Sequence, residues 1–183
     1  LLAASSATIP VGHTPGVLVD STADLTLALM LAVTRRVAEA DRWIRSGHWT
    51  DGWQSDLLLG TDISQATIGI VGLGPIGEAV VTRLKGFGCR VLTWNRTPKQ
   101  VPGAEPVALD ALFAQSDLVS LHTALTQETT HIASRARLAS MPSGSSPINT
   151  GRGLLVDEAA LIDEVQSGRL KAGLDVFVNE PLP

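Results

Sequence analysis

The stretch TIGIVGLGPIGEAV (residues 67–80) decides the fold of this 183-residue chain. It begins as an apolar strand and continues into the pattern G-x-G-x-x-G, which is formed by Gly72, Gly74 and Gly77. In this context Gly72 permits a tight turn, Gly74 lets the backbone approach a pyrophosphate, and Gly77 lets helix and strand pack closely. Pro75 suits the first turn of a helix. The stretch therefore predicts a strand, a phosphate-binding turn and a helix whose N-terminus faces the phosphates, against the alternative of a glycine-rich turn without a ligand.

Short apolar strands and helices alternate along the rest of the chain. The predicted strands are 67–71, 89–94, 105–109, 117–122, 148–150 and 171–177, and the predicted helices lie near 76–86, 110–115, 134–141 and 157–167. Apolar strands separated by helices indicate a parallel sheet that is covered on both faces. Pro147 cannot donate to a sheet ladder, so we expect the fifth strand to start after it. The predicted fold class is α/β, a doubly wound parallel sheet of the Rossmann type.

The region before this sheet has a different pattern of apolar residues. Apolar residues recur at helical spacing from Thr22 to Gly47, which predicts one unusually long helix of about 25 residues. The following segment, SGHWTDGWQSDLLLGTDISQ (residues 46–65), breaks the pattern and is predicted to be exposed. Its two tryptophans, Trp49 and Trp53, favour a buried contact with another subunit, and packing against another domain of the same chain is the alternative.

The bulk composition excludes several classes of function. The net charge is −4 and the basic residues are scattered, so we expect no nucleic-acid partner. Cys89 is the only cysteine, so we predict no disulfide framework, no metal site and a reducing, cytoplasmic location. The longest apolar run, Leu25 to Val33, is far shorter than the roughly 20 residues that a bilayer span needs, and the start of the chain lacks the features of a signal peptide. We therefore expect no membrane partner.

The second predicted strand ends in VLTWNRTPK (residues 91–99), where dinucleotide-binding folds commonly carry an acid that holds the adenosine ribose. Asn95 stands in that place. A carboxylate there would repel a 2′-phosphate, whereas Asn95, Arg96 and Thr97 offer a cation and neutral donors. Lys99 adds long-range attraction. This turn predicts a preference for NADP(H) over NAD(H), while the alternative is that Arg96 stacks on adenine and NAD is used.

Further polar clusters follow the later strands. They comprise residues 122–126, 150–152 and 175–180. In open α/β sheets the ligand crevice lies outside the carboxyl ends of the strands, so we expect these clusters to meet at one edge. Arg152, which is preceded by Asn-Thr-Gly and followed by Gly153, can bind a carboxylate bidentately and stabilise a developing oxyanion. The alternative for Arg152 is a surface arginine in a loop.

Five stretches together carry a resemblance to a known family. They are VGHTPGVLVDSTADLTLALMLAVTRR, GHWTDGWQSDLLLGTDISQATIGIVGLGPIG, SDLVSLHTALTQETTHI, INTGRG and AGLDVFVNEPLP. In these stretches the sequence resembles the D-isomer-specific 2-hydroxyacid dehydrogenases, and within them the glyoxylate/hydroxypyruvate reductases. The resemblance covers essentially the whole chain and corresponds to the cofactor-domain portion of such enzymes.

The resemblance implies roles for particular residues. Arg152 matches the catalytic arginine that binds the carboxylate and carbonyl of the substrate. Glu180 matches the acid that orients the catalytic histidine and raises its pKa. Asp175 matches the residue that meets the nicotinamide, and Thr150 and Ala124 line the cofactor. With the glycine and ribose turns included, the predicted cofactor-binding residues are Thr22, Gly72, Gly74, Pro75, Ile76, Gly77, Asn95, Arg96, Thr97, Ala124, Leu125, Thr126, Thr150, Gly151 and Asp175.

The resemblance also implies an activity, the NADPH-dependent reduction of glyoxylate or hydroxypyruvate to the D-2-hydroxy acid by a homodimer. Residues 1–19 would be a hinge or remnant of a substrate domain that is otherwise missing. Residues 20–183 would be the dinucleotide-binding domain, with a dimerisation helix and arm at 20–66. The catalytic histidine is expected beyond Pro183, because it matches none of His13, His48, His122 and His131. We therefore expect this piece alone to bind the cofactor and to turn over slowly or not at all.

Two other functions stay open at the level of sequence. One is a dinucleotide-sensing binding protein similar to corepressors built on this fold, which also keep equivalents of Arg152 and Glu180. The other is an NAD-dependent dehydrogenase for a different 2-hydroxy acid. The WTDGWQSDLLLG stretch (residues 49–60) is similar to the reductase branch, and the absence of an acid at Asn95 speaks against enzymes that use an acid there.

Overall fold

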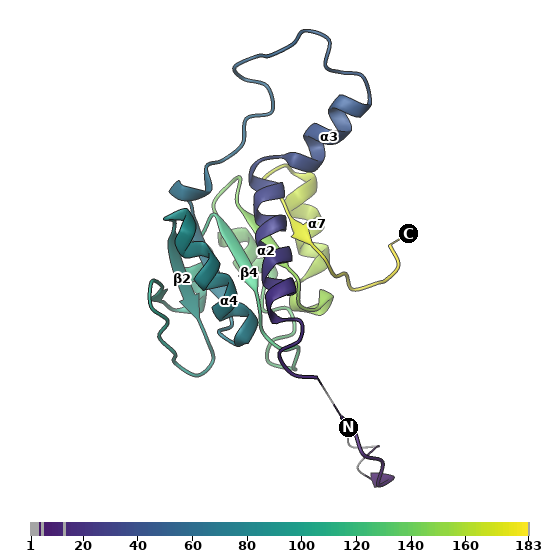
Figure 1. Ribbon diagram of the computed structural model, residues 1–183, viewed down its shortest axis with the longest axis vertical. Coiled ribbons are helices and arrows are strands. Elements are labelled where there is room, and N and C mark those ends of the chain that lie inside the picture. The colour runs from purple at the N-terminus through teal and green to yellow at the C-terminus, as the bar shows by residue number, and fades with distance from the viewer. Residues whose placement is uncertain (1–3, 5, 13, 183) are drawn as a thin grey trace.

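The computed structural model describes residues 4, 6–12 and 14–182, and its centre is a six-stranded parallel sheet in the order β3-β2-β1-β4-β5-β6 (Figure 1). The strands are β1 (Thr67–Val71), β2 (Arg90–Trp94), β3 (Glu105–Pro106), β4 (Leu118–Leu121), β5 (Ser146–Asn149) and β6 (Gly173–Leu174). The chain winds outward from β1 in one direction and from β4 in the other, so the strand order reverses between these two central strands. This topology is that of a doubly wound Rossmann sheet, and the predicted fold class is confirmed.

Helices cover both faces of the sheet. They are α2 (Val19–Thr34), α4 (Pro75–Leu84), α5 (Leu109–Gln115), α6 (Arg135–Ser140) and α7 (Glu158–Gln166), with short 3-10 turns η1 (Ile63–Gln65), η2 (Lys85–Phe87) and η3 (Gly153–Leu155). Helix α3 (Val37–Arg45) follows α2, and none of its residues is buried. Because side chains alternate along a strand, Ile68 and Ile70 of β1 pack with α2 and α4, while Val71 packs on the other face with α5, α6 and α7. Figure 1 shows α2 and α4 side by side in front of the sheet.

The predicted long helix is wrong, because the segment folds as two helices, α2 and α3. Arg36 separates them in the left-handed conformation, with φ of 54°, and its guanidinium is held by hydrogen bonds to Glu39. Two residues earlier, the buried Thr34 hydroxyl donates to the carbonyl of Met30 at 2.8 Å. A threonine hydroxyl bonded back to the carbonyl four residues earlier is associated with bending and weakening of a helix.

The predicted start of the fifth strand is also wrong, because Pro147 lies inside β5. The N–H of Ser146 donates to the carbonyl of Asp117 on the β4 side, so the nitrogen of the next residue points to the opposite side. There β6 pairs only from Gly173 onward, which lies opposite Ile148. Pro147 therefore removes no ladder bond. The edge strands β3 and β6 are two residues long each and shorter than predicted.

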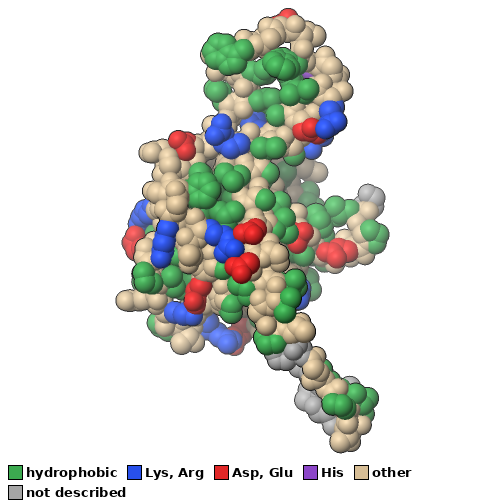
Figure 2. All heavy atoms as spheres, in the orientation of Figure 1, with side chains coloured by type: hydrophobic (Ala, Val, Ile, Leu, Met, Phe, Trp, Pro, Cys, Tyr) green, Lys and Arg blue, Asp and Glu red, His purple; other side chains and the backbone are tan. Residues whose placement is uncertain are grey.

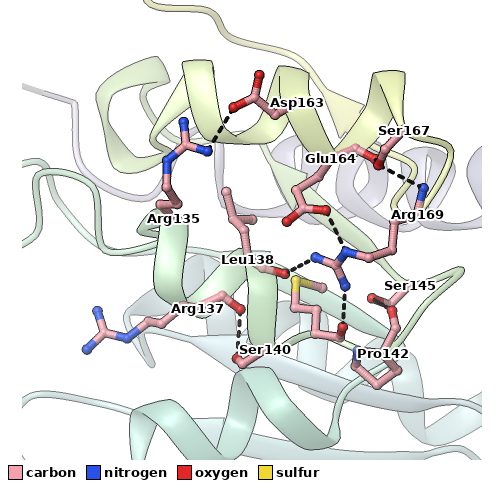
Figure 3. Close-up of polar contacts among 11 residues, drawn as sticks. Arg135, Arg137, Leu138, Ser140, Pro142, Ser145, Asp163, Glu164, Ser167 and Arg169 are labelled. Atoms are coloured by element: carbon pink, nitrogen blue, oxygen red, sulfur yellow. Dashed lines mark hydrogen bonds and ion pairs between the residues drawn. The ribbon is translucent and has the colours of Figure 1, made fainter.

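Arg169, which follows α7, ties that helix to the end of α6 (Figure 3). Its guanidinium donates to the carbonyls of Leu138 and Met141 at 2.5 and 2.6 Å, and to the carboxylate of Glu164 at 2.5 Å. The last carbonyls of a helix have no intrahelical partner, so Arg169 supplies donors that α6 cannot provide for itself. The hydrogen bond between Arg169 and Glu164 raises the pKa of Arg169 and lowers the pKa of Glu164.

The arm, defined as residues 46–62, extends with α3 away from the sheet (Figure 1). Trp53 is 83% exposed, and it lines a shallow hollow together with Trp43, Trp49 and Leu57. Figure 2 shows hydrophobic side chains gathered over this end of the molecule. The predicted exposed excursion is confirmed for residues 46–62, whereas Ile63 is buried and begins η1, and a contact with a partner stays a prediction. The division at residue 19 also stays a prediction, and residues 1–3, 5 and 13 within the first segment lie outside the described residues.

Candidate functional site

Three adjoining hollows form one groove across the carboxyl edge of the sheet. The first, of about 670 Å³, lies between the end of β2 and the segment after β3. The second, of about 210 Å³, shares Trp94, Asn95 and Arg96 with the first. The third, of about 580 Å³, shares residues 122–124 with the second and reaches the end of β5. The groove thus passes the point between β1 and β4 where the strand order reverses, as expected for a ligand crevice in this topology.

The glycine turn connects β1 to α4 in the middle of this groove. Gly72 has a φ of +102°, and a Cβ atom there would lie 2.7 Å from the carbonyl oxygen of His122. A Cβ atom on Gly77 would lie 2.1 Å from the carbonyl oxygen of Gly72, which shows how closely α4 packs on the turn. A Cβ atom on Gly74 would instead project into open space, with no atom within 4 Å.

This open space lies at the N-terminus of α4, where Pro75 is the first helical residue and no side chain caps the helix. Free N–H groups and the helix dipole make such a position favourable for a phosphate. A side chain on Gly74, which lines the second hollow, would fill the space. The residues present therefore fit a dinucleotide whose pyrophosphate lies against this turn.

At the end of β2, Asn95 links the glycine turn to the turn that follows β2 (residues 95–99). Its Oδ1 accepts the N–H of Leu73 at 3.0 Å, and its Nδ2 donates to the carbonyl of Thr97 at 2.8 Å. The side-chain amide is therefore bonded to the backbone on both sides, with one of its two N–H groups engaged by Thr97, and its role toward the ribose stays a prediction. Thr97 is exposed and lines none of the three hollows, whereas Arg96 lines two of them.

The third hollow collects the predicted residues of the nicotinamide end. Its lining includes Thr22, Ile76, Ala124, Leu125, Thr150, Gly151 and Arg152, while Thr126 lines the second hollow. Thr22 comes from α2, far from the others in sequence, and Ile76 comes from the first turn of α4. Most of the predicted cofactor-binding positions are thus brought together by the fold, and their roles in binding stay predictions.

Two buried polar residues that the sequence analysis did not select hold this end of the groove. Asn149 is 1% exposed; its Nδ2 donates to the carbonyl of Arg152 at 2.9 Å and its Oδ1 accepts the N–H of Gly151 at 3.0 Å. Thr26 places its hydroxyl 3.1 Å from that of Thr150. A polar residue inside the apolar face of a predicted helix was the available signal for Thr26, and the position before Thr-Gly-Arg was the signal for Asn149.

Arg152 is exposed and lines the third hollow, with one guanidinium nitrogen donating to the carbonyl of Gly151 at 2.7 Å. The two acidic residues predicted to act with it lie elsewhere. Glu180 is exposed and accepts the N–H of Phe177 at 2.9 Å, and Asp175 donates its N–H to the carbonyl of Asn149 at 3.0 Å. Neither acid lines any of the three hollows, so the structure does not bring Glu180 or Asp175 into the groove with Arg152.

His122 lies between the second and third hollows. Burial lowers its pKa from 6.5 to about 4, and its Nε2 lies 2.9 Å from the hydroxyl of Ser120. The imidazole is therefore neutral at pH 7 and is a poor proton donor there. This agrees with the expectation that His122 does not supply the catalytic proton. His13, another histidine that the sequence analysis set aside, lies outside the described residues.

The low pKa of His122 predicts an acid-sensitive contribution to stability. The unfolded chain takes up the proton below about pH 6.5 and the folded chain only near pH 4, so the free energy of unfolding falls across this interval by up to about 3 kcal/mol. We expect His122→Asn to be less sensitive to acid than the parent protein when urea unfolding is compared at pH 7 and pH 4.5. An imidazole that titrates near pH 6.5 by NMR in the folded protein would contradict this assignment.

Residues 4, 6–12 and 14–182 offer neither a metal centre nor a membrane span. In that part of the chain, no group of three or more His, Cys, Asp or Glu side chains is arranged to hold a metal ion. In the same part of the chain, the helices are all too short or too polar to cross a bilayer.

A doubly wound sheet with a glycine turn at the head of α4 and a groove across its carboxyl edge defines a dinucleotide-binding Rossmann domain. The family model for the D-isomer specific 2-hydroxyacid dehydrogenase NAD binding domain matches residues 27–183. The chain belongs to this family, and it corresponds to the domain that binds the nicotinamide dinucleotide.

Known proteins similar to the chain include a glyoxylate reductase from Thermococcus litoralis, 46% identical over an alignment 181 residues long that covers 94% of this chain and 55% of that protein. A crystal structure of a protein from Thermus thermophilus superposes with a TM-score of 0.94 and 49% identity, covering 100% of this chain and 58% of the other. A D-lactate dehydrogenase from Aquifex aeolicus complexed with NAD and lactic acid superposes with a TM-score of 0.87 and 31% identity, covering 97% and 54%. The chain spans about half the length of the curated relatives it matches.

Proposed function

We propose that the full-length protein reduces a small 2-keto acid, glyoxylate or hydroxypyruvate, to the D-2-hydroxy acid with NADPH, and that this chain supplies the cofactor domain. The observation that carries the proposal is the groove itself, with Arg152 at one end and the acid-free turn that bears Arg96 toward the other. The similarity to a glyoxylate reductase supports the same substrate class.

In this proposal each part of the groove has one task. The first and second hollows hold the adenosine, the glycine turn and the N-terminus of α4 hold the pyrophosphate, and the third hollow receives the nicotinamide and the keto acid. The bound cofactor supplies the hydride. Arg152 binds the carboxylate of the substrate and stabilises the negative charge that develops on its carbonyl oxygen. Glu180 and Asp175 line none of the three hollows here, and in this proposal they orient a histidine that donates the proton and meet the nicotinamide end, respectively.

The preference for NADPH rests on Arg96, which is the cation at the tip of β2. We expect the chain to bind NADPH at least tenfold more tightly than NADH, and Arg96→Asp to weaken NADPH binding by roughly ten- to a hundredfold, because a charge-assisted hydrogen bond is replaced by repulsion. Fluorescence titration of both cofactors measures this. Arg90→Asp is the matched control, since Arg90 lies at the opposite end of the same strand and is paired with Glu105.

Equal affinity for NADH and NADPH in the parent protein, unchanged in Arg96→Asp, would contradict the cofactor proposal. That result would instead favour an NAD-dependent dehydrogenase of another 2-hydroxy acid. The similarity to a D-lactate dehydrogenase complexed with NAD and lactic acid supports this second candidate.

We also propose that the protein is a cytoplasmic homodimer in which α3 and the arm contact the partner. The exposure of Trp53 and the apolar lining of the arm hollow support this, since apolar surface of this kind is typical of an interface. The molar mass in solution tests the dimer, and Trp53→Ser tests the part played by the arm. The single cysteine is consistent with a reducing compartment.

A further inference from the structure

Both cations near the predicted position of the 2′-phosphate are already paired with carboxylates from other elements. The guanidinium of Arg96 lies 3.3 Å from a carboxylate oxygen of Glu128. The ammonium of Lys99 pairs with Glu78 and also donates to the carbonyl of Leu73 at 3.2 Å. The positive charge at the end of β2 is therefore balanced locally in the absence of a ligand.

The two carboxylates come from different elements of the fold. Glu78 is in the first turn of α4, next to the glycine turn. Glu128 is in the segment after β4, which also lines the second hollow. Hydrogen bonds of the Thr129 hydroxyl to the carbonyl of Ala124 at 2.7 Å and to the N–H of Thr126 at 2.7 Å fix this segment. The segment therefore holds Glu128 within reach of Arg96.

The ion pairs are exposed enough to exchange partners. The side chains of Arg96 and Glu128 are 74% and 73% exposed, and those of Lys99 and Glu78 are partly exposed. Exposed ion pairs contribute little stability, so an incoming phosphate dianion can replace either carboxylate.

We propose that Glu128 and Glu78 compete with the ribose 2′-phosphate for Arg96 and Lys99, and so limit how strongly the protein prefers NADPH over NADH. This rests on the proposed function. A cofactor without the 2′-phosphate leaves both ion pairs intact. NADPH has to displace the carboxylates, and its additional negative charge then lies close to them. The two acids act as specificity-determining residues that lie outside β2, where such a residue is usually sought.

The test is the affinity of Glu128→Gln, Glu78→Gln and the double variant for NADPH and for NADH, measured by fluorescence titration at low salt. Each single variant is expected to bind NADPH about two- to fivefold more tightly, and the two factors are expected to multiply in the double variant. Affinity for NADH is expected to stay within about twofold of the parent value, since exposed pairs contribute little to a ligand that does not break them. Glu105→Gln is the matched control, because Glu105 forms a similar exposed pair with Arg90 away from the groove, and it is expected to change neither affinity.

Different failures have different meanings. If the parent protein prefers NADPH and Arg96→Asp removes the preference, but the glutamate variants bind as the parent does, the competition is overturned and the proposed function stands. Weaker NADPH binding in Glu128→Gln would also overturn it, because the acid would then be positioning Arg96 for the phosphate. An equal gain for NADPH and NADH would mean general repulsion of the cofactor, and would likewise overturn it.

Discussion

Gly77→Ala is expected to destabilise the folded protein by about 3 kcal/mol or more, the upper range for overpacking a close contact. The new Cβ atom would lie 2.1 Å from the carbonyl oxygen of Gly72, which is backbone and cannot rotate away. Helix α4 cannot shift to relieve the clash, because Val80, Val81 and Leu84 are completely buried between it and the sheet. Urea unfolding followed by circular dichroism measures the loss.

Gly74 provides the matched comparison within the same turn. Its backbone is extended, with φ of −75° and ψ of −177°, and a Cβ atom there meets nothing within 4 Å. We expect Gly74→Ala to change stability by less than about 1 kcal/mol, the scale of changes at a helix N-cap. Gly74→Val should keep the fold but weaken NADPH and NADH binding together, by tenfold or more, because it fills the space in front of α4. Unaltered binding by Gly74→Val would show that the pyrophosphate lies elsewhere.

Arg169→Met is expected to lower the free energy of unfolding by about 2–4 kcal/mol, since it leaves two helix carbonyls and one carboxylate without a charged donor. Methionine keeps much of the length of the side chain but none of its donors. The carbonyls of Leu138 and Met141 and the mostly buried carboxylate of Glu164 would each lose their bond to the guanidinium (Figure 3). Urea unfolding is again the measurement.

Arg135→Met is the control for this prediction. Arg135 pairs with Asp163 between the same two helices, but both side chains are well exposed, so its loss should lower stability by less than about 1 kcal/mol. Equal losses for Arg135→Met and Arg169→Met would contradict the view that α6 depends on Arg169 for its last carbonyls. Both variants should bind the cofactor as the parent does, since neither arginine lines the groove.

The parts of the fold that follow from local chemistry were predictable from the sequence. The apolar run at 67–71 became β1 with the predicted bounds, and the glycine pattern placed the start of α4 within one residue. What failed depends on contacts between distant segments. Pro147 is tolerated in β5 because the pairing with β6 starts at the next residue, Ile148. The interruption of the predicted long helix at Arg36 accompanies the buried hydroxyl of Thr34, two residues before it.

In the candidate site, too, some features could be predicted from the sequence and others depend on contacts between distant segments. The positions that line the groove could be predicted, because parallel strands end at one edge and bring their following segments together. The hydrogen-bond partners could not be predicted. The side-chain amides of Asn95 and Asn149 both form hydrogen bonds to the backbone of neighbouring turns. The alignment of the strands decides which backbone atoms lie within reach of these amides.

The double attachment of Asn95 has a practical consequence for anyone who wants to exchange the coenzyme. An aspartate at this position, the change that comparison with NAD enzymes would first suggest, would keep an acceptor for the N–H of Leu73 but would set an oxygen against the carbonyl of Thr97. The swap would therefore disturb the scaffold that joins two loops while it alters the charge. Redesign of the coenzyme preference should begin at Arg96, whose side chain pairs with the carboxylate of Glu128 and not with the backbone in this structure.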